Sequence, residues 1–328
     1  MFSNPLHVRC GDDILDKLRA AGLPGTRIKW CDPVCVGPTP RTENPEAWYR
    51  IRAEYLSHFG DQPLATVDAQ LREQDRALLD LDSHDAVVLW FEHDLFDQSI
   101  LIAVLSRLAD LPAAKDRIYL VTTDRFPGHS RFIGLGQLSA EELSTLYEIA
   151  APVSDEQIAL ARRAWSAWQA PDPFELQQLI DTNTGVLPFL EGAIRRHLQE
   201  LPWRKDGLSL TQRRVLEALR DGPMSAGVLF ERIQEAEEHP WMGDAMLFEE
   251  LERMRFLESP LIRAASDKPI RRDAMVESTP LANEILDGAV DALDANPVDR
   301  WVGGVHVTSE CPYRWSGVRV TSLASAKG

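Results

Sequence analysis

The sequence predicts an α/β protein whose first part is a doubly wound, mainly parallel sheet. Two observations support this prediction. Within residues 1–135, short apolar segments alternate with helical segments, and that alternation is typical of parallel strands joined by helical crossovers. After residue 135 the strand pattern stops while helical periodicity continues, which predicts a helical connector over 136–206 and a smaller module over 207–328.

Four strands and four helices are expected in the first part. Each expected strand is short and rich in apolar residues, and these strands lie at 6–10, 26–30, 85–91 and 116–124. The expected helices have apolar residues at helical spacing, and they lie at 11–25, 44–60, 67–84 and 97–111, the last as a long amphipathic helix. A parallel sheet with helices on both faces would be Rossmann-like.

The later segments are mainly helical. The connector is expected to form helices within 139–170, with one break near Pro152, and within 173–203 around a Thr/Asn/Gly turn. In the module, three helical segments precede a possible two-stranded hairpin, at 209–222, 225–240, 243–256 and 260–280. Helix, helix, helix, hairpin is the order of a winged helix, so we expect a winged-helix-like α+β module with one more helix at 281–293.

The charge balance argues against nucleic acid as a partner. The chain of 328 residues carries 51 Asp and Glu against 35 Lys and Arg, and a surplus of 51 − 35 = 16 acids repels a phosphate backbone. No apolar run approaches the roughly 18 residues of a membrane span, and the first residues lack the pattern of a signal peptide. We therefore expect a cytoplasmic protein without membrane contact.

Polar side chains stand between two apolar segments in the stretch "WFEHDLFDQ". The expected strand ends at Phe91, and the polar residues that follow it are Glu92, His93, Asp94, Asp97 and Gln98. Ligands of open α/β sheets bind outside the carboxyl ends of the strands. We therefore expect a ligand site at this junction, with Glu92 or His93 as a general acid or base.

Part of the junction also has a structural explanation. Asp94 followed three residues later by Asp97 is the spacing of a capping box at a helix N-terminus. Capping does not need Glu92, His93 or Gln98. Clustered carboxylates repel one another and persist where a cation or a shared proton relieves that cost. A divalent cation such as Mg²⁺ on Asp94 and Asp97 is therefore the alternative to simple capping.

Other strand ends are expected to contribute to the same edge. Gly11, Asp12 and Asp13 follow the first strand, and Asp124 follows the fourth. We expect Asp12 or Asp13 to line a concave pocket together with at least three of the junction side chains, although either could instead cap the first helix. No dinucleotide fingerprint or P-loop is present, so a cation between the acids and a phosphate would be needed to bind a nucleotide here.

Several motifs resemble a known bacterial family. The segments "HVRCGDDI", "WCDPVCVGPTP" and "WFEHDLFDQ" are similar to the family catalogued as domain of unknown function 1835. The segments "GLSLTQRRVLEAL", "HPWMGDAMLFEEL" and "VDRWVGGVHV" resemble the C-terminal region that accompanies that domain. The resemblance touches nearly the whole chain. It implies the α/β fold and the junction as a shared feature, and it implies no activity, because the family has no settled one.

The tail "VDRWVGGVHVTSECPYRWSG" is expected to form a strand-turn segment around its Gly-Gly pair. Its tryptophans, Trp301 and Trp315, can pin the tail onto the body of the protein. The alternative is that Arg300 and His306 complete a site supplied mainly by the first part.

Three classes of function remain open from the sequence. The favoured one is an enzyme or sensor for a small phosphorylated or nucleotide-like ligand at the acidic carboxyl edge of the sheet. The second is a non-catalytic regulator that binds a protein partner through the winged-helix-like module. The third, a DNA-binding transcription factor, is opposed by the acidic third helix, since the only basic cluster of the module is Lys268, Arg271 and Arg272.

Overall fold

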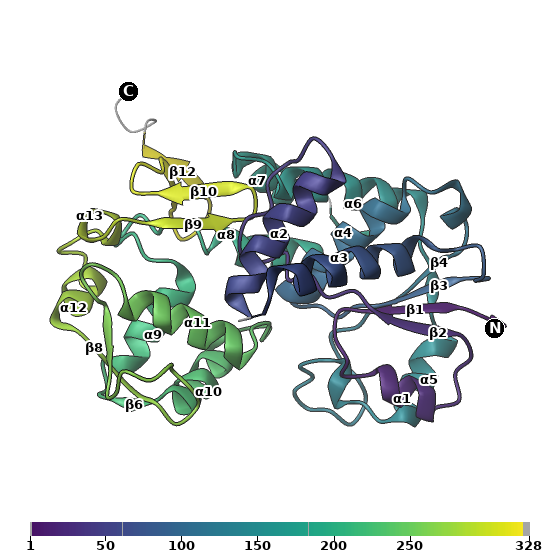
Figure 1. The fold of residues 1–328 in the computed structure, drawn as a ribbon, viewed down its shortest axis with the longest axis horizontal. Coiled ribbons are helices and arrows are strands. Elements are labelled where there is room, and N and C mark those ends of the chain that lie inside the picture. The colour runs from purple at the N-terminus through teal and green to yellow at the C-terminus, as the bar shows by residue number, and fades with distance from the viewer. Residues whose placement is uncertain (1, 61, 183, 324–328) are drawn as a thin grey trace.

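A five-stranded sheet organises the first part of the protein. The structure, a computed structural model, describes residues 2–60, 62–182 and 184–323 (Figure 1). The sheet has the order β2-β1-β3-β4-β5, and β1 to β4 run parallel while β5 is antiparallel. Its strands are β1 (Leu6–Arg9), β2 (Thr26–Lys29), β3 (Val87–Trp90), β4 (Ile118–Val121) and β5 (Ala151–Pro152). The α/β class and the mainly parallel sheet are confirmed. The strand β5 was not expected, because two residues carry no readable alternation.

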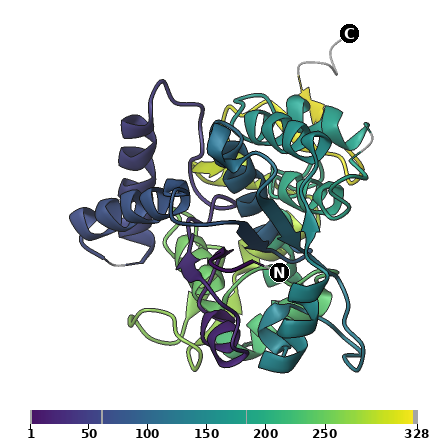
Figure 2. The same cartoon turned by 90° about the vertical axis from the view of Figure 1, so that its right-hand side faces the viewer.

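Helices cover both faces of this sheet. Figures 1 and 2 show α1 (Leu15–Ala20) and α5 (Ala140–Glu148) on one side, and α4 (Leu95–Leu108) and α6 (Asp155–Trp168) on the other. The helices α2 (Pro45–Phe59) and α3 (Leu64–Leu79) pack against each other beside α4. Alternation along β3 serves both faces: Val88 and Trp90 join the apolar cluster under α1 and α5, whereas Val87 and Leu89 join the cluster around α4.

The helix α4 differs from the amphipathic helix expected at 97–111. Eleven of its 14 residues are buried, including Asp97, Gln98 and Ser99 in its first turns. The helix is enclosed because α6 and α8 (Leu190–Leu198) pack on the side that faces away from the sheet. Although α4 is apolar, no helix within the described ranges is long and apolar enough to cross a membrane.

The connector helices extend the core of the first part. Helices α6, α7 (Phe174–Ile180) and α8 pack on one another, and α6 and α8 contact α4. One continuous apolar cluster runs from the sheet through these helices into the C-terminal part. The division of the chain near residues 135 and 206 therefore stays a prediction.

The C-terminal part alternates helices with short antiparallel strands. Its elements are, in order, α9 (Leu210–Leu219), β6 (Met224–Ser225), α10 (Ala226–Ala236), α11 (Asp244–Arg255), β7 (Ile262–Ala264) and β8 (Met275–Ser278). The strands form a sheet of order β6-β8-β7. The single helix expected at 281–293 is two helices, α12 (Pro280–Leu286) and α13 (Ala292–Ala295). They are separate because Gly288 adopts a left-handed φ of 77°.

The tail forms two small hairpins. The first pairs β9 (Asp299–Val302) with β10 (Val305–Thr308), and the second pairs β11 (Tyr313–Trp315) with β12 (Val320–Ser322). The expected turn is present at Gly303, whose φ is 62°. The expected packing of Trp315 is also present, since its side chain is buried and its backbone bridges to Trp203.

Candidate functional site

The carboxylates expected at the junction do come together, at the carboxyl ends of β1 and β3. The strand order reverses between these two strands, which is where α/β sheets leave a crevice. The side chain of Arg9, the last residue of β1, occupies this crevice. Its guanidinium donates hydrogen bonds to the carboxylates of Glu92 and Asp97, to that of Asp13 at 3.1 Å, and to the carbonyl of Trp90 at 3.2 Å.

Arg9 is the cation that the clustered acids require, and sequence reasoning missed it. Its side chain is buried, and it reaches Glu92 across 83 positions of the sequence. The signal that could have found it is an arginine at the end of an otherwise apolar strand, "LHVR", where a buried charge needs a partner.

Arg9 disfavours a divalent cation at the junction. The carboxylates of Glu92, Asp94 and Asp97 place one oxygen each within 4.8 Å of one another, which is a possible metal-binding arrangement. Five of their six oxygens, however, accept hydrogen bonds, and the donors belong to Arg9, Cys10, Leu135 and the backbone N–H groups of Glu92 and Asp97. The guanidinium of Arg9 already supplies positive charge between Glu92 and Asp97, and it would repel a divalent cation placed beside it. The expected role of Asp94 and Asp97 in binding a metal stays a prediction.

Asp94 is a helix cap, as the alternative explanation proposed. Its carboxylate accepts the N–H of Asp97 at 2.9 Å at the start of α4. The second half of a capping box is absent within the described residues, because the Asp97 carboxylate accepts from Arg9 and from the N–H of Glu92 instead.

The acids at the junction are in excess over the single guanidinium. Burial raises the pKa of Glu92 to about 7. Burial and the charges of Asp97 and Glu92 raise the pKa of Asp94 well above its usual range. Burial opposes the charge on Arg9, yet the carboxylates of Asp97 and Glu92 raise the pKa of Arg9. Arg9 therefore stays charged, and the raised pKa of Asp94, which Arg9 does not contact among the described interactions, favours the protonated form of that carboxyl group.

A glycine-containing segment closes the junction from outside. A side chain at Gly134 would place its Cβ 2.4 Å from the Glu92 carboxylate, and one at Gly136 would lie 3.0 Å from that of Asp13. Lys17 holds this segment down through the carbonyl of Gly136 at 2.6 Å. The junction is therefore closed, whereas the sequence led us to expect a concave pocket, because Arg9 and this backbone occupy the space.

The other predicted ligand residues lie around this closed centre. Gly11 and Asp12 are at the rim, where Asp12 pairs with Lys29 at 2.7 Å. Neither Asp12 nor Asp13 caps α1, which begins after Ile14 without a side-chain cap.

Gln98 is buried and donates to the carbonyl of Glu92 at 2.5 Å. Asp124 is far less buried and pairs only loosely with Arg125, at 3.7 Å.

His93 points away from the acids and toward the C-terminal part. Its Nδ1 lies 3.3 Å from the carbonyl of Thr123, and its ring meets that of His239 at a centroid distance of 4.6 Å. Burial and the neighbouring His239 lower the pKa of His93, so the imidazole is neutral at pH 7. Both residues predicted to be catalytic are buried, and His93 also lines a pocket.

We call that space the His93 pocket, a cavity of about 440 Å³ between the end of β3, helix α8 and the segment after α10. Three arginines and two glutamates line it, namely Arg195, Arg196, Arg214, Glu237 and Glu238. Gly192, in the first turn of α8, also lines it, and the N–H groups of a first turn have no intrahelical acceptor. Its lining thus has three cations against two acids, and all three arginines also form ion pairs, with Glu191, Glu200 and Glu237.

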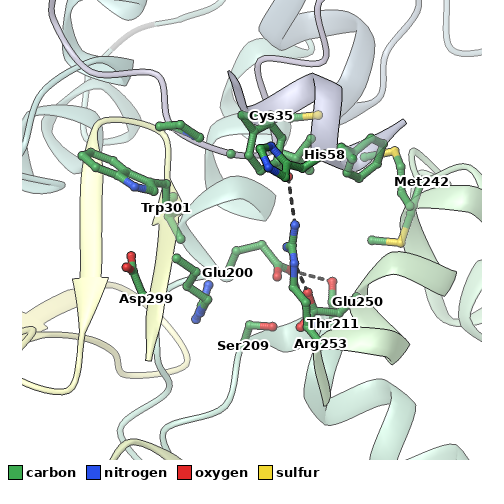
Figure 3. A pocket seen from close by; sticks show the side chains of 18 of the residues that line it. Cys35, His58, Glu200, Ser209, Thr211, Met242, Glu250, Arg253, Asp299 and Trp301 are labelled. Carbon is green, nitrogen blue, oxygen red and sulfur yellow. Dashed lines mark hydrogen bonds and ion pairs between the residues drawn. The ribbon is translucent and has the colours of Figure 1, made fainter. Parts of the chain in front are cut away.

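A second space, which we call the large cavity, separates α2 from α11 and β9 (Figure 3). It measures about 580 Å³ and has four aromatic side chains in its wall: Tyr55, Phe59, Trp241 and Trp301. The hydroxyl of Tyr55 accepts from Arg253 at 3.2 Å, which joins α2 to α11 beside the cavity. Sequence reasoning missed this space because its wall comes from four distant segments.

Arg300, predicted as a ligand residue, lines the large cavity and not the junction. Its Nη2 atom is buried and has no hydrogen-bond partner within the described part of the chain. Burial lowers the pKa of Arg300, although that shift leaves an arginine charged at neutral pH. His306, its expected companion, instead pairs with Asp299 at 2.7 Å and stacks on Trp301.

Comparisons with known proteins identify no family. No family model matches the chain, and no curated protein matches it. One similar solved structure is that of the Plasmodium falciparum topoisomerase II DNA-binding, cleavage and re-ligation domain, with 12% sequence identity and a TM-score of 0.45. The similarity covers 94% of this chain and 51% of that one, so this chain spans about half of its length. At this TM-score the likeness indicates neither a shared fold nor a shared activity. The resemblance to the domain of unknown function 1835 family stays a prediction.

Proposed function

We propose that this protein is an enzyme or sensor that binds a small phosphorylated ligand in the His93 pocket. The observation that carries the proposal is the wall of that pocket, where three guanidiniums and the first turn of α8 converge at the carboxyl edge of the sheet. Arg196 and Arg214 share the carboxylate of Glu237, and Arg195 pairs with Glu191 in a partly exposed contact. Guanidiniums and helix N-termini are the groups that bind phosphate in proteins. The sequence placed the ligand at the acid cluster; the proposed site lies on the other side of His93.

The geometry of His93 suits a general base. Its Nδ1–H donates to the carbonyl of Thr123, which leaves the lone pair on Nε2. The imidazole is neutral at pH 7 because burial lowers its pKa. In an enzyme of this kind, Nε2 would accept a proton from a hydroxyl or water next to the bound phosphate. In a sensor, the same nitrogen would accept a hydrogen bond from the ligand.

We also propose that the two ends of the chain are Rossmann-like and winged-helix-like. The first assignment is supported by the parallel order β2-β1-β3-β4 with helices on both faces. The second is supported by the order of α9, β6, α10, α11, β7 and β8, in which the last two strands pair as a hairpin.

Calorimetry with inorganic phosphate, ribose 5-phosphate and AMP as probes tests the proposed ligand class. Arg195 is the variant of choice, since its side chain is 40% exposed and makes one ion pair, with Glu191, and a long hydrogen bond of 3.5 Å to the carbonyl of Val318, so its loss costs little stability. We expect Arg195→Gln to weaken the best probe about tenfold, because a charged hydrogen bond is lost. Arg163→Gln, an exposed position on α6 outside the described cavities, is the matched control.

The proposal fails if none of the three probes binds at about 1 mM, or if Arg195→Gln behaves like Arg163→Gln. His93→Gln separates the two classes of function. Loss of turnover with retained binding indicates an enzyme, whereas a weaker affinity without any turnover in the wild type indicates a sensor.

A regulator that binds a protein partner through the C-terminal module is the second candidate. The observation that favours it is the exposure of apolar side chains there, with Phe256 at 72%, Val228 at 46% and Met275 at 44%. Phe256→Ser should then abolish capture of that partner and leave phosphate binding unchanged. A partner that binds Phe256→Ser normally would remove this candidate.

A further inference from the structure

The large cavity contains two buried hydrogen-bond donors that nothing in the described part of the chain satisfies. One is Nη2 of Arg300 and the other is the indole Nε1 of Trp241, and both residues line the cavity. Buried donors in folded proteins are nearly always paired, and an unpaired one costs free energy. Two such donors in the wall of one cavity point to a ligand with acceptor oxygens.

The acids near Arg300 do not supply those acceptors, because none of their oxygens is hydrogen-bonded to its Nη2 atom in the described part of the chain. Glu200 pairs with Arg196 at 2.5 Å and accepts from the hydroxyl of Thr211 at 2.7 Å. Glu250 accepts from Gln212 at 2.8 Å and pairs with Arg253 at 3.5 Å. Of the two guanidiniums in this wall, that of Arg300 keeps a buried nitrogen without a hydrogen-bond partner in the described part of the chain.

The charge of the wall disfavours a ligand with two negative charges more than one with a single charge. Four carboxylates line the cavity, from Glu54, Glu200, Glu250 and Asp299, against the two guanidiniums of Arg253 and Arg300. A phosphate monoester, with a charge near −2, would meet this surplus of acids in a space of low dielectric, where like charges repel strongly. A carboxylate carries one charge and has two oxygens that match the fork of a guanidinium.

The shape of the cavity indicates a flat, apolar body for the same ligand. Its volume of about 580 Å³ is within the range that holds a small organic molecule. Aromatic rings from α2 (Tyr55 and Phe59), from the segment before α11 (Trp241) and from β9 (Trp301) surround it. Rings of this kind stack on planar ligands.

We propose that the large cavity is a second ligand site, separate from the His93 pocket, and that it binds an aromatic carboxylate. Arg300 binds the carboxylate, the indole N–H of Trp241 donates to an oxygen of the ligand, and the aromatic wall holds the ring. Because the wall includes α2 from the first part and α11 from the C-terminal part, the ligand also links these two parts next to the Tyr55–Arg253 contact.

Calorimetry on the full chain with three matched probes tests the ligand class. The probes are 2-naphthoate, its neutral amide 2-naphthamide, and 2-naphthyl phosphate. We expect 2-naphthoate to bind at least about tenfold more tightly than 2-naphthamide, which lacks the charge. The same difference from 2-naphthyl phosphate is expected in the Arg195→Gln variant, in which the proposed phosphate site of the His93 pocket is weakened. Equal or weaker binding of 2-naphthoate would overturn the assignment, as would no binding at about 1 mM.

Two pairs of variants test the residues. Arg300→Gln should remove the preference for 2-naphthoate over 2-naphthamide, whereas Arg195→Gln, in the His93 pocket, should leave it intact. Trp241→Phe keeps a ring but loses the N–H, and it should weaken 2-naphthoate by about three- to tenfold. Trp301→Phe is its control, because its indole N–H is not among the unsatisfied donors. A preference that survives Arg300→Gln would contradict the proposal, and so would equal effects of the two tryptophan variants. If Arg300→Gln does not fold, the tryptophan pair still decides.

Discussion

Arg9 and Arg300 are both arginines with buried guanidinium nitrogens near the ends of strands, and they differ in their surroundings. Arg9 donates to three carboxylates and a carbonyl and is enclosed by the backbone of residues 134–136. Arg300 borders an open cavity and keeps a buried donor without a partner among the described residues. A cluster of charges, as around Arg9, can be fully paired within the protein, whereas a buried donor without an acceptor, as on Arg300, is the better indication of a ligand.

The largest expected effect comes from removing the balanced cation. Arg9→Met leaves Glu92 and Asp97 buried without a counter-charge, so we expect the free energy of unfolding to fall by about 3–5 kcal/mol. Arg300→Met removes an unsatisfied donor and should change it by less than about 1 kcal/mol. Urea denaturation of both variants measures the difference. Similar losses of stability in the two variants would contradict the different roles given to Arg9 and Arg300.

Closure of the junction by glycine is expected to matter next. Gly134→Ala places a methyl group 2.4 Å from the Glu92 carboxylate, so we expect a loss of about 1–3 kcal/mol in the free energy of unfolding. Gly192→Ala is the matched control, since its Cβ meets nothing within 4 Å and alanine favours the helix by up to about 1 kcal/mol. Thermal melting compares the two. A neutral Gly134→Ala would show that the covering segment is loosely held.

The stability of the junction should depend on pH through Glu92. The pKa of Glu92 is raised to about 7 by burial, above its unfolded value near 4.3. The folded state therefore binds the proton more tightly, and the stability that this contributes is present below pH 4.3 and is lost as the pH rises through 7. Between pH 5 and pH 7 the wild type should lose about 2 kcal/mol relative to Glu92→Gln. Urea midpoints at both pH values test this, and parallel pH profiles would contradict it.

The smallest expected effect concerns the surface cations Lys268, Arg271 and Arg272. Arg272 pairs with Glu231 at 2.7 Å and with Asp244 at 3.8 Å, so the basic cluster of Lys268, Arg271 and Arg272 is partly neutralised. We expect negligible binding to duplex DNA at about 150 mM salt, and no measurable change when Lys268, Arg271 and Arg272 become alanine. Fluorescence anisotropy is the measurement. Sub-micromolar, sequence-specific binding would restore the DNA-binding alternative.

Local patterns were sufficient to predict much of the fold. The strands of the parallel sheet, the long helices and the tail hairpin follow from periodicity and glycine positions, because both depend on neighbouring residues. The junction was located correctly at the end of β3, and Asp94 does cap α4. Burial of α4 on all sides was not predictable, because it depends on α6 and α8, which come later in the chain.

The content of the sites was less predictable than their location. The acids of the junction were visible, but their counter-ion Arg9 lies 83 positions from Glu92, and no periodicity links them. His93 was expected to join the acids, yet the turn after β3 sends its ring toward His239. The composition of the tail predicted Arg300 as a ligand residue, but the aromatic wall near it comes from distant segments and depends on the tertiary fold.

The bridge between Trp203 and Trp315 has a consequence for the synthesis of the protein. Residues 202–204 lie just after α8, and they hydrogen-bond to Trp315, which pairs its N–H with the carbonyl of Pro202 and its carbonyl with the N–H of Arg204. A nascent chain can pair its four parallel strands once residue 121 has left the ribosome, whereas the segment after α8 meets Trp315 only after more than a hundred further residues. Closing so long a loop is slow. The contact between the tail and residues 202–204 therefore forms later than the sheet.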